Sequence, residues 1–175
     1  MDIRSIDKDF NEAMFITKVN NIFIMLYTSI MMDDLDRVRH FISDNLEKKY
    51  ELILKELKEK HLRQMYDELN VKDTNITNIE IKDNKICINV KLISRYMDYK
   101  VDENFNVVSG DNTRRVENIN YLTLEKTINS EYNSSARKCP GCGANISVNT
   151  SGKCEYCGSI FDIENYDWVL TSIEM

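Results

Sequence analysis

A chain of 175 residues with a formal net charge of −6 and a pI of about 5.0 is a poor match for an extended nucleic-acid surface, which needs clustered lysine and arginine. Its 42% hydrophobic and 30% charged residues are ordinary for a globular protein and suffice for a core. The longest apolar run, residues 22–32, is shorter than the roughly 20 residues of a membrane-spanning helix, and residues 1–10 lack a basic-then-apolar secretory pattern. We therefore expect a cytoplasmic protein without a transmembrane segment or a nucleic-acid partner.

Helical patterns come first along the chain. A helix is predicted over residues 9–32, where apolar side chains recur every three or four positions: Phe15, Val19, Ile22, Leu26 and Ile30. Asp33 and Asp34 then interrupt the stripe, and either suits the cap of a short second helix up to Ile42. Ser43 is the predicted N-cap of a third helix that continues to about residue 69.

After Asn70 the apolar pattern changes to a period of two, which predicts strands. A tight turn is predicted at residues 83–84, followed by a long strand whose alternation changes phase near residues 93–96, as a β-bulge would cause. A turn at residues 102–106 and a strand through residues 121–124 follow, and the last strand spans residues 167–175. Helices followed by strands with short turns predict an α+β fold built on an antiparallel meander.

Two Cys-x-x-Cys pairs lie close together near the end of the chain. They are Cys139 with Cys142 and Cys154 with Cys157, and a glycine follows each pair, Gly143 and Gly158. Zinc prefers four soft ligands in a tetrahedron, and a Cys-x-x-Cys turn lets two sulfurs reach one ion. The backbone curls around the sulfurs with a positive φ, which the glycine after each pair adopts without strain. The spacing is typical of a zinc ribbon.

The alternatives for these cysteines are a redox dithiol, which leaves the second pair unexplained, and iron, which also accepts four thiolates. Four thiolates fill the coordination sphere of zinc, so we expect one structural ion rather than a catalytic centre. Cysteines at metal spacing favour a reducing compartment, and the fifth cysteine, Cys87, is expected to be a small strand residue.

Beyond these patterns, the segment "FITKVNNIFIMLYTSIMMDDLDRVRHFISDNL" resembles the start of the Tim44-like domain. That family includes the C-terminal domain of a mitochondrial inner-membrane import-motor scaffold and bacterial members. "MDYKVDENFNVVSGD" is similar to its Asp-Tyr strand and turn, and "DWVLTSIE" is similar to its closing Trp strand. Some bacterial members insert a cysteine ribbon before that tryptophan, as this chain does. The helix-packing and turn positions that match the family are Phe15, Phe23, Leu26, Asp34, Leu35, Arg39, Phe41, Ser43 and Leu46.

The resemblance implies a cone-shaped, nuclear-transport-factor-two-like α+β fold, with three N-terminal helices on a curved antiparallel sheet. It divides the chain into a Tim44-like domain, residues 9–137 plus 166–175, and a zinc-ribbon insertion in the last hairpin, residues 138–165. It also implies a non-catalytic scaffold related to transport, with a protein partner, at the inner face of a membrane.

Two classes of function stay open at this stage. The first is a scaffold whose cone also holds a lipid or another apolar ligand. The second is a small-molecule-binding cone with isomerase or dehydratase chemistry, which needs an inward acid or base; since no His–Asp pair at a defined spacing emerges, we expect no enzyme. The side chains of a helical apolar stripe more commonly belong to the hydrophobic core than to a ligand cavity. The residues expected to line a cavity are Phe15, Ile22, Phe23, Leu26, His61, Tyr99 and Trp168.

Overall fold

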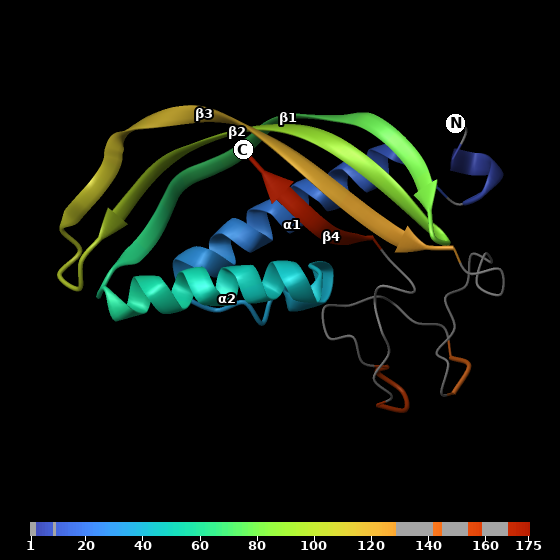
Figure 1. Cartoon of the computed structure of the whole chain (residues 1–175), viewed down its shortest axis with the longest axis horizontal. Helices are drawn as coiled ribbons and strands as arrows, with labels where there is room; N and C mark the ends of the chain where they lie inside the picture. Colours follow the sequence, from blue (N-terminus) through green and yellow to red (C-terminus); the bar gives the residue numbers. More distant parts are fainter. Residues whose placement is uncertain (1–2, 9, 129–141, 145–153, 159–167) are drawn as a thin grey trace.

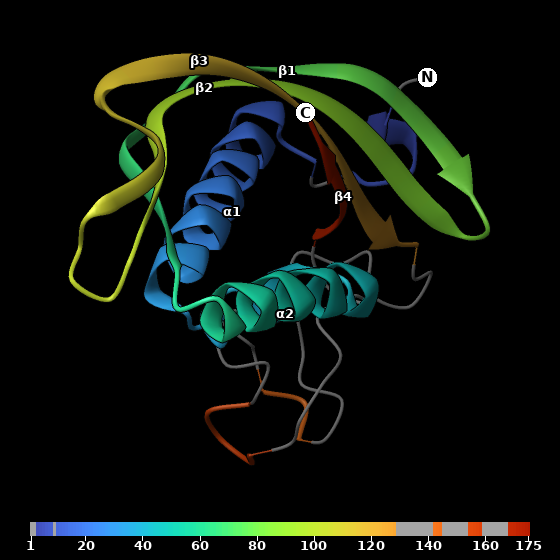
Figure 2. The same cartoon turned by 60° about the vertical axis from the view of Figure 1, so that its left-hand side comes forward.

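The computed structural model describes residues 3–8, 10–128, 142–144, 154–158 and 168–175. It contains two α-helices, α1 (Glu12–Met32) and α2 (Asp44–Glu59), and two short 3-10 turns, η1 (Ile3–Ser5) and η2 (Arg39–Phe41). Four strands follow: β1 (Arg63–Lys82), β2 (Lys85–Val101), β3 (Val107–Thr127) and β4 (Val169–Glu174). In two views, β1, β2 and β3 arch over α1, and α2 lies at the open side of the arch (Figures 1 and 2).

The helix α1 is capped at both ends and buried along one side. The Asn11 side chain accepts a hydrogen bond from the Met14 amide, and Asp33 ends the helix in the left-handed conformation. Val19, Phe23 and Leu26 are fully buried. By length and composition this 21-residue helix is also a candidate membrane span, which the eleven-residue apolar run did not suggest, and a buried core helix meets the same criterion.

The sheet is antiparallel throughout, in the order β1-β2-β3-β4. Asp83 and Asn84 join β1 to β2 with φ of 45° and 63°, the paired left-handed conformation of a tight hairpin, as predicted. The predicted turn at residues 102–106 is also present, and Asp102 Oδ1 accepts the amides of Asn104 and Asn106 at 2.9 Å.

The core lies between α1 and the concave face of the sheet. Inward side chains of β2 and β3 meet the α1 stripe, as the period-two pattern predicted: Ile86, Ile88, Val90, Leu92, Leu122 and Leu124. A buried hydrogen-bonded chain crosses this core, because the Tyr27 hydroxyl donates to Asn120 Oδ1 and Asn120 Nδ2 donates to Ser94 Oγ. The predicted α+β class, with a curved antiparallel sheet around the helices, is confirmed.

The prediction of the second and third helices was wrong in two respects. The second is only the 3-10 turn η2, preceded by a turn in which Asp34 Oδ1 accepts the Asp36 amide. The third begins as predicted, with Ser43 Oγ accepting from the Leu46 amide, but it ends at Glu59 rather than near residue 69. His61, with φ of 55°, turns the chain into β1, whose first residue pairs with Val101. Strand pairing with β2 therefore outweighs the helical spacing of the leucines that follow α2, and the chain continues as β1.

The predicted bulge in β2 exists, but it lies slightly later in the strand. The register against β3 shifts between Tyr96 and Asp98, and the register against β1 shifts after Asp67. Gly110 of β3 lies opposite this region with φ of +83°, and a Cβ there would fall 2.2 Å from the Asp98 carbonyl oxygen. Only glycine fits that position without moving the backbone.

Candidate functional site

The helix α2 is anchored at its first turn and separates from the core toward its end. The Ser43 amide donates to the Leu170 carbonyl of β4 at 2.9 Å, and Leu46 is the one buried residue of the helix. Further along, Leu54 and Leu57 are only half-buried, and Leu52 is 62% exposed. The apolar side of the C-terminal half of α2 is therefore only partly covered, and two cavities lie beside it.

The larger cavity, here called the Phe105 cavity, has a volume of about 400 Å³ and lies between α1, α2 and the β2–β3 turn. Its walls are apolar, formed by Ile30, Leu54, Leu57, Leu62 and Phe105. This volume falls within the range of about 300–1,000 Å³ that is usual for binding pockets.

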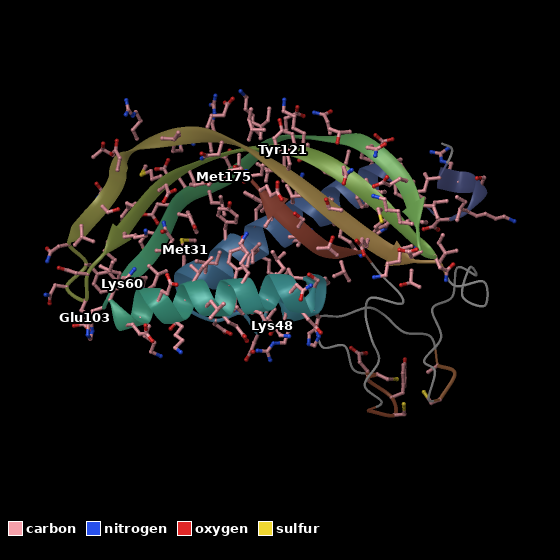
Figure 3. The ribbon with its side chains drawn as sticks, in the orientation of Figure 1. Met31, Lys48, Lys60, Glu103, Tyr121 and Met175 are labelled. Atoms are coloured by element: carbon pink, nitrogen blue, oxygen red, sulfur yellow. The ribbon has the colours of Figure 1, made fainter. Side chains whose placement is uncertain are left out.

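Charged side chains form the rim of the Phe105 cavity. His61 Nδ1 lies 2.7 Å from Glu103 Oε1, so a contact joins the end of α2 to the β2–β3 turn. The Arg63 guanidinium lies 5.6 Å from the centre of the Phe105 ring, within range of a cation–π contact. The amide groups of Asn106 lower the pKa of Asp102 below its usual value, so that carboxyl stays ionised at the rim. Figure 3 shows Lys60 and Glu103 at this end of α2.

The smaller cavity, here called the tyrosine cavity, has a volume of about 250 Å³. It shares four wall residues with the Phe105 cavity, namely Ile30, Leu57, Leu62 and Gln64, and adds the phenol groups of Tyr50 and Tyr66. The Gln64 amide nitrogen donates to Asp98 Oδ1 at 2.7 Å and to the Tyr99 carbonyl at 3.1 Å. Gln64 is buried, so its hydrogen bonds hold the floor of both cavities in place.

The aromatic rings at the tyrosine cavity form one packed cluster. Tyr66 lies 4.6 Å from Tyr27 and 5.3 Å from Tyr96, measured between ring centres. Burial raises the pKa of Tyr50 to about 12, and burial together with the Asp98 charge also raises the pKa of Tyr66. Both phenols therefore remain protonated at neutral pH and act as hydrogen-bond donors.

The residues that the sequence predicted to line a cavity are dispersed in the structure. Phe15, Ile22, Phe23 and Leu26 are buried in the core between α1 and the sheet. Trp168 is also buried, at 4.9 Å from the Phe15 ring.

His61 and Tyr99 lie elsewhere. Of the predicted set, His61 alone lines either of the two cavities described, and it does so from the exposed rim rather than facing inward. Tyr99 lies on the opposite face of β2 from Asp98, and its hydroxyl donates to Asp67. The residues that do line the cavities include Tyr50 and Leu57 of the predicted third-helix stripe, whose incomplete burial no sequence pattern signals.

Three of the four ribbon cysteines lie together in the described part of the chain. The sulfurs of Cys142, Cys154 and Cys157 lie within 4.8 Å of one another, and the Cys142 and Cys154 sulfurs are 3.8 Å apart. Gly143 and Gly158 have φ of 72° and 73°, as predicted, and the Gly158 amide donates to the Cys154 carbonyl at 2.9 Å. Cys139 lies outside the described residues.

This cluster suits a metal ion. Sulfurs at about 2.3 Å from a tetrahedral zinc lie roughly 3.8 Å from each other, which matches the separation of Cys142 and Cys154. The cluster belongs to the connection between β3 and β4, which are adjacent antiparallel strands. A metal bound there would close that connection.

An antiparallel sheet around one core helix, a groove along a second helix and a cysteine cluster between the last two strands define a small α+β domain with a candidate metal site. The family model described as the Tim44-like domain matches residues 1–134, and the chain belongs to this family. No curated protein matches the chain.

Among solved structures, one match is the crystal structure of the intermembrane space region of the chloroplast protein ARC6. It is 8% identical, with a TM-score of 0.46, and the match covers 91% of this chain and 94% of that chain.

Proposed function

We propose that this protein is a non-catalytic scaffold domain that binds an apolar segment of a partner protein in the Phe105 cavity. One observation carries the proposal: the apolar side of the C-terminal half of α2 is only partly covered, beside a cavity of about 400 Å³. Apolar walls with a charged rim are the usual composition of a groove that receives a peptide or helix. Membership of the Tim44-like family supports a scaffold role.

The place of action that we propose is the cytoplasmic side of a membrane, with the domain bound peripherally. The resemblance to import-motor scaffolds supports this location. The exposed apolar side chains of α2, Leu52 at 62% and Ile53 at 37%, offer a surface for a membrane-bound partner.

Site-specific photo-cross-linking tests the partner groove. A photoreactive phenylalanine analogue replaces Phe105, which lines the cavity, and Tyr121 serves as the matched control because it is a similarly exposed aromatic residue on the outer face of the sheet. Figure 3 shows Tyr121 on that outer side of the arch. We expect a discrete protein adduct from position 105, weakened by Leu57→Lys, and none from position 121. Equal adducts from both positions, or an adduct that Leu57→Lys leaves unchanged, would contradict the proposal.

We also propose that Cys139, Cys142, Cys154 and Cys157 together hold one structural zinc ion, in a ribbon of residues 138–165 inserted into a domain of residues 9–137 and 166–175. The spacing of the two pairs and the 3.8 Å sulfur separation support this ligand set. Metal analysis should find about one zinc per chain, and Cys154→Ser should lose it. A chain that keeps full metal content after that substitution, or that binds iron instead, would refute the assignment.

A further inference from the structure

The tyrosine cavity carries a polar patch that the scaffold role does not use. Gln64 pairs with Lys100 across β1 and β2, and Tyr66 pairs with Asp98, so all four side chains share the concave face of the sheet. The Tyr66 ring confirms the direction of this face because it packs on Tyr27 of α1. One end of the concave face is therefore polar, whereas most of the rest is apolar core, crossed by the hydrogen bonds of Asn120 and Ser94.

Two phenol hydroxyls in this cavity have no acceptor. The deeper tyrosines are engaged: Tyr27 donates to Asn120 Oδ1 at 3.4 Å, and the Tyr96 hydroxyl lies 3.9 Å from Met175 Sδ. Among the residues that the structure describes, the Tyr50 and Tyr66 hydroxyls have no protein hydrogen-bond partner, and neither is a fully buried atom, so both are open to the cavity. Both line the same cavity of about 250 Å³.

The residues that line the cavity include one more positive than negative group. Lys60 and Lys100 line it together with a single carboxylate, Glu56. Asp98, the other acidic group near the phenols, accepts a hydrogen bond from Gln64 at 2.7 Å and is exposed to solvent. The remaining walls are apolar, formed by Ile30, Ile53, Leu57 and Leu62.

We propose that the tyrosine cavity binds a small carboxylate with a short apolar body, whose oxygens accept hydrogen bonds from Tyr50 and Tyr66 and whose charge is balanced by Lys60 and Lys100. Hydrogen bonds from neutral donors to a carboxylate are short and about twice as strong as those between neutral groups, so two phenol donors in one cavity favour an oxyanion. The leucine and isoleucine walls accept the apolar body. The hydrogen-bond donors and lysines of this site do not line the Phe105 cavity, although the two cavities share four wall residues, so substitutions at the donors distinguish the two proposals.

Amide chemical shifts of the purified full chain, followed by NMR during titration, test the ligand class. The probes are phenylbutyrate, the corresponding amide, which keeps the shape and an acceptor without the charge, and the corresponding amine. We expect phenylbutyrate to shift the Gln64 side-chain signals, the amide to bind about tenfold more weakly, and the amine to cause no shift at Gln64. Equal affinity for the three probes, or no binding of phenylbutyrate, would overturn the proposal.

Substitutions then assign the donors. Tyr50→Phe and Tyr66→Phe keep the ring packing and should each weaken phenylbutyrate about tenfold, the effect of losing one hydrogen bond to a charged group. Lys60→Met should weaken it as well, whereas Lys48→Met, on the same helix but pointing away from the sheet, should not (Figure 3). Thermal unfolding of each variant shows whether the fold is retained. Folded Tyr→Phe variants with unchanged affinity would refute the site, and an unchanged Phe105 adduct in them would leave the scaffold proposal standing.

Discussion

Truncation of Leu57 tests whether this residue borders an open groove or belongs to the packed core. Leu57 is half-buried and borders both cavities, so Leu57→Ala removes three carbon atoms that already face open space. Full burial of three such groups is worth roughly 2.4 kcal/mol at about 0.8 kcal/mol each, and half-burial reduces the loss to about 1 kcal/mol. No new enclosed cavity forms, and the high helix propensity of alanine offsets part of the loss.

Leu26→Ala is the matched variant in the core. Leu26 is 0% exposed between α1 and the sheet, so the same truncation leaves an enclosed cavity and should cost about 2–5 kcal/mol. Urea unfolding followed by circular dichroism measures both losses. We expect Leu57→Ala to lower the free energy of unfolding by less than half as much as Leu26→Ala, and to weaken the Phe105 adduct. A loss at Leu57 as large as the loss at Leu26 would show that α2 is packed as core and that the groove is closed.

Three further substitutions test the fold and its charges. Gly110→Ala places a Cβ 2.2 Å from a carbonyl oxygen at a residue with φ of +83°. The substitution should lower the free energy of unfolding, measured with urea, by at least about 2 kcal/mol. A smaller loss would mean that β2 and β3 move apart without strain. Lys126→Met leaves Asp7, which is 8% exposed, without its ion-pair partner. We expect the free energy of unfolding to fall by about 1–3 kcal/mol in the same measurement. An unchanged free energy would mean that the ion pair contributes nothing to stability. Hydrogen bonds from Lys72 and Arg95 lower the pKa of Glu117. The ionised Glu117 therefore contributes to stability above the usual glutamate pKa of about 4.3, and this contribution is lost as the pH falls below that value. Glu117→Gln should therefore flatten the acid side of the stability profile, and an unchanged profile would contradict this.

Particular residues show how far local patterns determine the fold. Asp83 and Asn84 tolerate the left-handed backbone, so the hairpin could be predicted from its two residues. The stripe of α1 and the alternation of β2 predicted which faces are buried, because each period reports a face without reference to other elements. The end of α2 could not be predicted in this way, because the leucines after Glu59 fit a helical period as well as a strand.

The two kinds of candidate site also differ in how far the sequence predicted them. The cysteine spacing predicted that the sulfurs gather, and three of them do so in the described part of the chain, because a Cys-x-x-Cys turn brings its two sulfurs together through local geometry. The two cavities beside α2 depend instead on the angle at which that helix leaves its anchor at Leu170, and on the β1–β2 register that brings Gln64, Tyr66 and Lys100 to one face.

The sequence by itself determined the α+β class, the faces of α1 and β2, the tight turns and the cysteine spacing of a candidate metal site, since each rests on neighbours a few residues apart. Only the tertiary structure decided that Phe15, Phe23 and Leu26 are core and that Tyr50 and Leu57 border open cavities. The physical reason is that an apolar stripe reports affinity for an apolar environment, whereas the space left beside it depends on how distant elements pack.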